Sequence, residues 1–184
     1  PYYALKYAFS SHWTAYLTTA ESFEDQSLYF TADDKALDPV LGRSYELGLK
    51  GEHWDGKLNT NITVYRSRRD NFAVRISQPN DFDVPGKACC YVGDGKFLAQ
   101  GVELEISGQL TPQWQINGGY TYDDNETEYG NNDGLRYASY TPEHMFRVWS
   151  RYDLSGDLSR WSVGGGVKTQ SSFFRSGTVA TWDP

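Results

Sequence analysis

Apolar and polar residues alternate along most of the chain, which is the period-2 pattern of β-strands. Residues 44–50, for example, place Tyr45, Leu47 and Leu49 on one face of such a strand. No segment sustains an apolar 3.6-residue period long enough to predict a helix. Further strands are predicted at residues 3–9, 13–23, 58–64, 101–107, 114–121, 146–152 and 161–168. The pattern therefore predicts an all-β protein with about eight strands.

Short turns alternate with long polar connections along the predicted strands. Asp55 and Gly56 favour the positive φ angles of a tight hairpin turn, and Pro112 marks another turn because proline cannot donate to a strand ladder. The long polar segments lie at about residues 24–42, 77–97 and 123–142. In an up-and-down antiparallel sheet, every second connection falls at the same end, so the long loops gather at one rim. This asymmetry is typical of an outer-membrane β-barrel, which has short periplasmic turns and long external loops.

Tryptophan placement favours the same architecture. Trp13, Trp54, Trp114 and Trp161 each lie within about five residues of a short turn, so they mark one rim. Amphipathic rings prefer the membrane–water interface, where such barrels carry aromatic girdles. Trp149 lies outside this belt, and we expect it to face lipid in the middle of its strand.

The two faces of the predicted strands differ in charge. The face that carries Leu47, Ile62, Leu104 and Val163 has no charged residue in the middle of any strand, as a lipid-facing surface requires. The opposite face suits a wet or plugged lumen and carries these side chains: Glu46, Lys50, Asn59, Asn61, Glu103, Glu105, Gln115, Asn117 and Lys168. The sequence thus predicts a transmembrane β-barrel wall.

Composition excludes several other classes of protein. Acidic side chains outnumber basic ones by 24 to 17, and the sequence has no basic run of five or more residues. We therefore expect no nucleic-acid partner, because phosphate binding depends on clustered Lys and Arg. No stretch reaches the ~18 consecutive apolar residues of a transmembrane helix. The 14 Tyr, nine Phe and six Trp residues argue against intrinsic disorder.

Candidate chemical sites are few. Cys89 and Cys90 are adjacent, and their Cα atoms stand about 3.8 Å apart, which is short for a disulfide. A strained vicinal disulfide and two free thiols both remain open, whereas a zinc site is not expected without further paired ligands. The carboxylate-rich run 123–128 lacks the order of an EF-hand, and we interpret it as a solvated loop. No Ser, His and acid combination converges on a turn, so we predict no catalytic residues and no enzyme.

Several motifs in a fixed order resemble one known family. Residues 39–50 fit a Pro-x-x-Gly-x-x-Tyr-Glu-x-Gly-Leu-Lys pattern, and residues 16–23 form an aromatic strand that ends in Glu-x-Phe. The remaining matching segments are 101–108, 118–121, 141–144 and 163–167. In this order and spacing they resemble the barrel of TonB-dependent ferric-siderophore receptors, of the group that takes up pyoverdine or hydroxamate siderophores. The resemblance covers nearly the whole chain.

The resemblance implies an up-and-down transmembrane barrel of 22 strands that is filled by an N-terminal plug. Residues 1–184 are then a partial barrel domain of about eight strands, with the plug domain absent. The chain begins at Pro1 without an initiator Met, and we expect it to be a fragment.

The resemblance also implies a function. The receptor would lie in the outer membrane of a Gram-negative bacterium and import ferric siderophores into the periplasm. Its partners would be the ferric siderophore, outer-membrane lipid, and the TonB–ExbB–ExbD complex acting through the plug. No cofactor and no protein metal ligand are expected, because the iron travels inside a chelate that already fills its coordination sphere.

Candidate siderophore-binding residues were chosen for residue type and for their place in the long segments, where aromatic side chains can pack against a chelate. They are Tyr29, Phe30, Tyr91, Tyr129, Arg136 and Tyr140.

Two other hypotheses remain. A self-contained small outer-membrane barrel could serve as an anchor, an adhesin or a barrel enzyme. A soluble ligand-binding β-barrel would instead have an apolar cavity and a polar outer surface.

Overall fold

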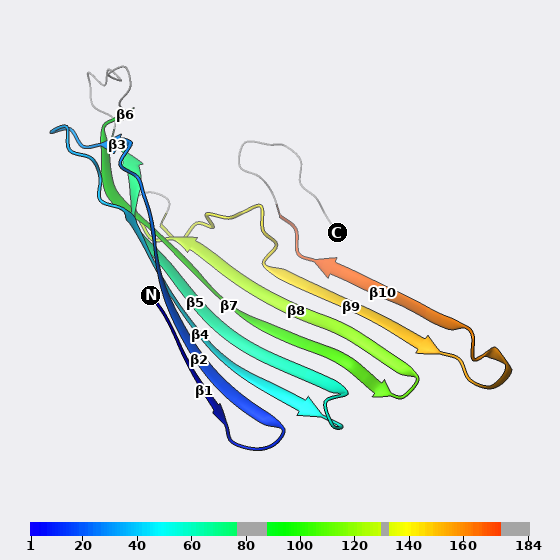
Figure 1. Ribbon diagram of the computed structural model, residues 1–184. Coiled ribbons are helices and arrows are strands. Elements are labelled where there is room, and N and C mark those ends of the chain that lie inside the picture. The colour runs from blue at the N-terminus through cyan, green and yellow to red at the C-terminus, as the bar shows by residue number, and fades with distance from the viewer. Residues whose placement is uncertain (77–87, 130–132, 174–184) are drawn as a thin grey trace.

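Eight antiparallel strands form one long curved sheet in the computed structural model, which describes residues 1–76, 88–129 and 133–173 (Figure 1). The strand order is β1-β2-β4-β5-β7-β8-β9-β10. The strands are β1 (Tyr2–Ala8), β2 (Trp13–Glu24), β4 (Val40–His53), β5 (Leu58–Arg75), β7 (Tyr91–Thr111), β8 (Trp114–Thr127), β9 (His144–Asp153) and β10 (Ser162–Gln170). Two short parallel strands, β3 (Tyr29–Phe30) and β6 (Ala88–Cys89), form a second sheet. The prediction of an all-β protein with eight main strands is confirmed.

The sheet is open at both edges. Among the described strands, β1 pairs only with β2 and β10 only with β9. A self-contained eight-stranded barrel would pair β1 with β10, so the eight strands of this chain do not form one. Within the same described ranges, no helix is long and apolar enough to span a membrane.

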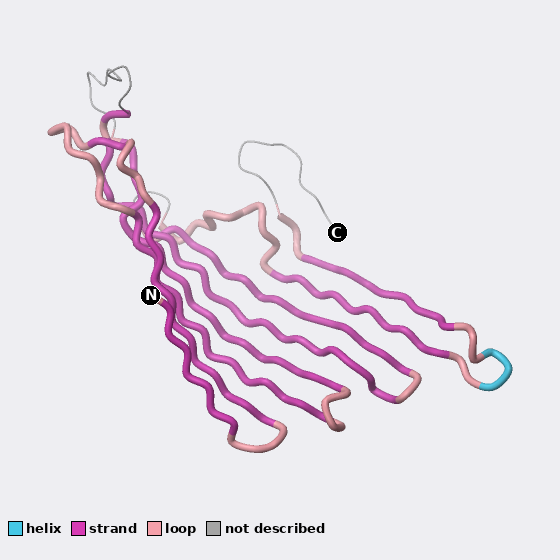
Figure 2. Tube along the Cα trace, viewed as in Figure 1, coloured by secondary structure: helices cyan, strands magenta, loops and turns pink. Residues whose placement is uncertain are grey.

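Short and long connections alternate as predicted. The turns at the lower end of Figure 1 are short, whereas the long connections after β2, β5 and β8 lie at the opposite end. Trp54, Asp55 and Gly56 all have positive φ angles of 53°, 55° and 81°, as the Asp-Gly turn requires. The turn between β9 and β10 contains a single 3-10 turn, η2 (Gly156–Leu158), which is the helical segment in Figure 2.

The long connections are shorter than the sequence indicates. Residues 91–97 belong to β7 and residues 123–127 belong to β8, although both ranges were expected in loops. The ladder between β5 and β7 continues as far as the pair Arg75 and Tyr91, with register shifts between residues 69 and 74. Polar side chains do not end these strands, because the backbone hydrogen bonds between β5 and β7 continue beyond the apolar band. The register shifts bend the strands without interrupting their pairing.

The two faces of the sheet are those predicted. The side chains of Leu47, Ile62, Leu104 and Val163 remain 54%, 46%, 40% and 64% exposed on one face, here called the apolar face. Glu46, Lys50, Asn61 and the other predicted polar residues lie on the opposite, polar face, because paired positions across the strands share a side. A soluble barrel would have buried the apolar row, so that hypothesis does not fit the sheet.

Trp149 lies on the polar face, contrary to the expectation that it faces lipid. Its cross-strand partners are Asn117 and Gly166, whereas Val148 shares the apolar face with Val167. A Cβ atom on Gly166 would come within 2.8 Å of the Trp149 ring. The glycine therefore makes room for a large ring on this side, which is why an aromatic residue can occupy a position that its hydrophobicity alone assigns to lipid.

A tyrosine on the polar face locks three strands together. Tyr16 of β2 lies over Gly48 of β4, and its hydroxyl reaches Thr63 of β5 at 2.8 Å. The same hydroxyl donates to Glu46 at 2.7 Å, and Lys50 lies 5.1 Å from the ring centroid. Gly48 is required because a Cβ atom there would stand 2.2 Å from the ring. The contact joins neighbouring strands through side chains as well as through their backbones.

Candidate functional site

Four aromatic side chains gather at the end of the sheet where the long connections lie, and we call them the aromatic cluster. Phe72 of β5 and Phe97 of β7 meet edge to face, with ring centroids 4.6 Å apart. Tyr129 and Tyr137, from the connection between β8 and β9, approach the Phe97 ring at 5.7 and 4.9 Å. Phe97 pairs with Arg69 and shares the polar face with it, so the cluster lines the polar side of the wall. Offset and edge contacts of this kind are the favoured packing of aromatic rings.

Charged groups surround the aromatic cluster. Arg69 lies over the Phe72 ring, 4.6 Å from its centroid, and forms an ion pair with Glu24. Burial raises the pKa of the Tyr137 phenol, and Asp123 adds to this rise, so the hydroxyl stays neutral and able to donate a hydrogen bond. The arrangement combines apolar ring surfaces with a few polar groups, which is the usual composition of a site for a small organic ligand.

The connection that carries Tyr137 is fastened to the wall by a polar network. The Asn125 side chain is only 1% exposed, accepts the backbone N–H of Ala138 at 2.9 Å and donates to Asp123 at 2.8 Å. Tyr65 of β5 also donates to Asp123, at 2.8 Å across the strand between them. Run 123–128 is therefore not the solvated loop expected from its carboxylates, because its backbone is in β8 as far as Thr127 and Asn125 is buried.

The first long connection is fastened in a similar way. Gln26 is 5% exposed, donates to the carbonyl oxygens of Asp38 and Asn71, and accepts the backbone N–H of Ala73 at 3.1 Å. Asn71 in turn donates to the carbonyl oxygens of Asp38 and Pro39 at 2.9 Å each. Both ends of this connection are thus fixed to β5, and β3 is held near the start of β7.

The structure brings together some of the candidate residues predicted from the sequence. Tyr29 and Tyr91 form an edge-to-face pair with centroids 4.8 Å apart, and Phe30 pairs with Cys89 in the small parallel sheet. Tyr129 belongs to the aromatic cluster. Tyr91 lies in β7 and not in a loop, as noted above.

The other two candidates have different surroundings. Arg136 donates to the carbonyl oxygens of Asp123 and Thr141 at 3.2 and 3.3 Å, and its guanidinium lies 3.8 Å from Glu143. These contacts place it in the framework of the connection. Tyr140 is 64% exposed at the surface.

Sequence reasoning missed Phe72, Phe97 and Tyr137. Phe72 lies on an extension of β5 beyond the predicted strand 58–64, whereas Phe97 lies in the predicted long segment 77–97, where its residue type and position were available signals. Tyr137 lies in the predicted long segment 123–142, so its aromatic residue type and its position were signals that could have selected it.

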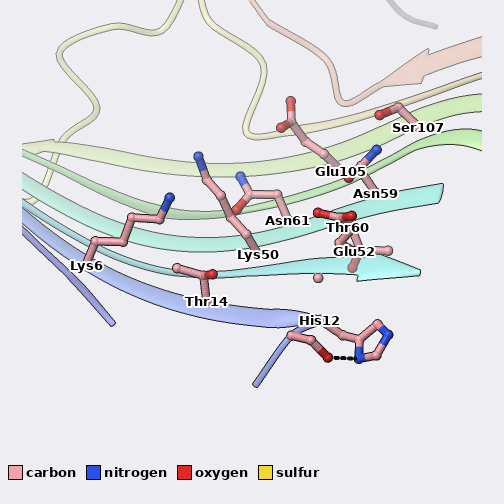
Figure 3. A pocket seen from close by; sticks show the side chains of 12 residues that line it. Lys6, His12, Thr14, Lys50, Glu52, Asn59, Thr60, Asn61, Glu105 and Ser107 are labelled. Atoms are coloured by element: carbon pink, nitrogen blue, oxygen red, sulfur yellow. Dashed lines mark hydrogen bonds between the residues drawn. The ribbon is translucent and has the colours of Figure 1, made fainter. Parts of the chain in front are cut away.

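The polar face forms a shallow groove of about 380 Å³ near the short turns (Figure 3). Lys6, Lys50, Asn61 and Glu105, from four different strands, extend from the same side of the sheet in this view. The only side-chain hydrogen bond drawn there joins Ser11 to His12 at 2.9 Å. The groove presents charge of both signs and is suited to contact with water or with a polar partner.

Cys90 is disulfide-bonded, so of the two alternatives left open by the sequence, the free thiols are wrong. Among the residues that the structure describes, no three His, Cys, Asp or Glu side chains gather as metal ligands.

Comparison with known proteins identifies the family. The family model described as TonB dependent receptor-like, beta-barrel matches residues 1–184. The chain belongs to this receptor family. Over 182 residues it is 35% identical to the ferric-pyoverdine M114 receptor PbuA of a Pseudomonas species, an alignment that covers 97% of this chain and 21% of that receptor. The chain thus spans about a fifth of the length of the curated relatives that it matches.

Solved structures of receptors have the same fold. The pyoverdine outer membrane receptor FpvA from Pseudomonas aeruginosa, bound to pyoverdine, gives a TM-score of 0.79 at 30% identity and covers 94% of this chain and 25% of that one. The alcaligin outer membrane receptor FauA from Bordetella pertussis gives 0.76 at 33% identity and covers 92% and 29%. The chain is therefore a segment of an outer-membrane barrel wall. In such a barrel the apolar face meets lipid, the polar face lines the lumen, and the long connections lie outside the cell.

Proposed function

We propose that this chain forms part of a receptor that captures a ferric siderophore of the pyoverdine type and imports it into the periplasm. The observation that carries the proposal is the aromatic cluster, which lies on the lumen side of the wall at the external end. Its ring surfaces offer apolar contact to an aromatic chromophore, and the nearby Arg69 and Tyr137 offer polar contacts. The 35% identity to a ferric-pyoverdine receptor supports this ligand class.

The iron would enter as a finished chelate, and the protein would supply no metal ligand of its own. Recognition then rests on the organic shell of the chelate, which aromatic rings and hydrogen-bonding groups can bind. The role is that of a transport receptor and not of an enzyme, since binding and release leave the siderophore chemically unchanged.

We further propose that inward release is driven by the TonB–ExbB–ExbD complex acting on a plug that contacts the polar lumen wall. Lys6, Lys50 and Glu105 form a mixed-charge surface that suits a polar domain packed inside the barrel. In cells, uptake of radioactive ferric pyoverdine should stop when TonB is deleted, whereas binding at the cell surface should persist. Uptake that continues at the same rate without TonB contradicts this part of the proposal.

Ligand capture is tested by Phe97→Ala in the full-length receptor that contains this segment. Phe97 contacts three other rings, so its loss removes the centre of the cluster. We expect affinity for ferric pyoverdine to fall about tenfold, as judged from the usual contribution of an aromatic contact. The measurement is titration of the purified receptor by quenching of pyoverdine fluorescence.

The matched control is Phe146→Ala, which removes an aromatic ring from the lipid-facing side of β9. It should leave ferric pyoverdine affinity unchanged. Equal affinity in the wild type and in a folded Phe97→Ala variant would show that the cluster does not contact the chelate. Tighter binding of ferric alcaligin than of ferric pyoverdine would assign the receptor to a different siderophore class.

A further inference from the structure

Three arginines lie close together on the lipid-facing side of the wall. Arg43 of β4 is directly opposite Arg68 of β5, and Arg66 is directly opposite Tyr45. Paired positions share a face, and Tyr45 belongs to the apolar face together with Leu47. The three guanidinium groups are therefore outside the barrel, on the surface that otherwise carries aliphatic side chains.

Their height on the wall places them at the upper membrane boundary. A strand tilted by about 45° and rising about 3.3 Å per residue climbs roughly 2.3 Å per residue along the membrane normal. Arg66 and Arg68 follow Leu58, the first residue of β5, by 8 and 10 positions, so they stand roughly 19 and 23 Å above it. The apolar band of such barrels is about 25 Å tall. The backbone at Arg66 and Arg68 thus lies roughly 6 and 2 Å below the top of this band, and an extended arginine side chain can carry its guanidinium from there to the lipid head groups of the outer leaflet.

Carboxylates of the protein pair with two of the three arginines. Arg43 pairs with Glu21 at 3.2 Å, and Arg68 pairs with Asp70 and Glu128 at 3.0 and 3.1 Å. In contrast, the Arg66 guanidinium makes no hydrogen bond or ion pair with any residue that the structure describes. Arg43 and Arg68 are directly opposite each other, and their carboxylate partners offset the repulsion between these two like charges.

An open groove of about 880 Å³ lies beside these arginines, and all three line it. Its remaining walls include Phe23, Leu41 and Tyr45, which are 78%, 58% and 50% exposed. Glu21 and Asp70 also line the groove, and Glu128 pairs with Arg68, so three carboxylates balance the three arginines and the Arg66 guanidinium alone among them has no acidic partner. The groove therefore joins one guanidinium that is free to pair to an apolar wall, which matches a molecule with a phosphate group at one end and hydrocarbon at the other.

We propose that this groove binds a phosphorylated lipid of the outer leaflet, with the phosphate held between Arg43, Arg66 and Arg68. Guanidinium groups bind phosphate through paired N–H donors, and an otherwise unpaired Arg66 gives up no internal contact to do so. The acyl chains lie against Leu41 and the aliphatic row below it. The site is on the opposite side of the wall from the aromatic cluster, so it is independent of siderophore capture.

The test measures lipid binding by native mass spectrometry of the full-length receptor released from detergent. The probe is lipid A, which carries two phosphate groups on an acylated disaccharide, and the comparison lipid is the same molecule with its phosphates removed. We expect the wild-type receptor to bind the phosphorylated form at least about tenfold more tightly. Arg66→Gln should weaken that binding about fivefold, and Arg43→Gln with Arg66→Gln about 25-fold, because each basic residue near the surface contributes a similar factor.

The matched control is Arg147→Gln, which removes the same charge from the lumen-facing side of β9. It should leave lipid binding unchanged, and Arg66→Gln should leave ferric pyoverdine affinity unchanged. The proposal is overturned by equal binding of phosphorylated and dephosphorylated lipid, or by equal effects of Arg66→Gln and Arg147→Gln. It is also overturned if excess inorganic phosphate displaces the lipid, since the groove would then be a site for free anions.

Discussion

The contact of Tyr16 with Gly48 makes a sharp prediction about what holds this wall together. In Gly48→Ala, the new methyl group would stand 2.2 Å from two carbon atoms of the Tyr16 ring, so the ring must move. Movement breaks the hydrogen bonds of its hydroxyl to Glu46 and Thr63. Thr63 is only 3% exposed, so water cannot readily replace the lost partner.

The magnitude follows from the bonds that are lost. A hydrogen bond to a charged acceptor contributes about 1.5–3 kcal/mol and a neutral one about 1 kcal/mol. The cation–π contact with Lys50 adds about 0.5 kcal/mol at an exposed site. Alanine in place of glycine returns about 0.5–1 kcal/mol by restricting the unfolded chain. We therefore expect Gly48→Ala to lower the free energy of unfolding by about 2–4 kcal/mol.

A double-mutant cycle separates this explanation from a general effect of substitution in a strand. Unfolding of the full-length receptor in detergent is followed by loss of heat-modifiable gel mobility and by circular dichroism. In a Tyr16→Ala background the methyl group meets no ring, so Gly48→Ala should have almost no further effect. Gly165→Ala is the control, because a Cβ atom there meets no atom within 4 Å. The reasoning is refuted if Gly48→Ala costs the same with and without the Tyr16 ring.

Two further substitutions test the faces of the sheet and the polar network. Leu104→Lys should destabilise the folded barrel by about 2–4 kcal/mol in denaturant titrations, because it places a charge in lipid. The neighbouring Glu105→Gln, on the lumen side, should change stability by less than about 0.5 kcal/mol. Similar effects of the two substitutions would contradict the assigned faces. Asn125→Ala leaves the Ala138 N–H without its acceptor. We expect local opening of residues 133–143 to become about tenfold more frequent, from a loss of about 1.4 kcal/mol. Limited proteolysis measures this opening, and an unchanged cleavage rate would show that Asn125 does not fasten this connection to the wall.

The faces and the end asymmetry of the sheet were predictable because they depend on period and spacing alone. Leu47 and Leu49 in β4, Ile62 and Val64 in β5, and Leu104 and Ile106 in β7 each stand two positions apart, and a strand can satisfy that repeat in one way only. Trp149 was assigned to the wrong face because its hydrophobicity was given more weight than the alternation, which places it opposite its neighbour Val148. Gly166 makes room for the ring on the polar side, and this pairing becomes visible only when the register is known.

The candidate site was less predictable than the fold. Residue type and position in a long segment found Tyr29, Tyr91 and Tyr129, which do make ring contacts. Phe97 also met both criteria, since it is aromatic and lies in the predicted segment 77–97, yet it was not among the candidates. Arg136 met both criteria, yet its donors are used on nearby backbone oxygens. Type and position cannot reveal how many of a side chain's hydrogen bonds are already committed.

The lumen side of the wall links stability to the external end through one shared carboxylate. The Tyr65 side chain passes over Gly101 to donate to Asp123, and a Cβ atom on Gly101 would lie 2.6 Å from the Tyr65 hydroxyl. This contact resembles the one in which Tyr16 lies over Gly48. Asp123 also accepts from Asn125, which holds Ala138 next to Tyr137 in the chain. A single set of bonds therefore fastens β5 to β8 and fixes the connection that completes the aromatic cluster. Loss of the Tyr65–Asp123 hydrogen bond should therefore destabilise the connection that carries Tyr137 as well as the sheet, whereas loss of the Tyr16 contacts should destabilise the sheet alone.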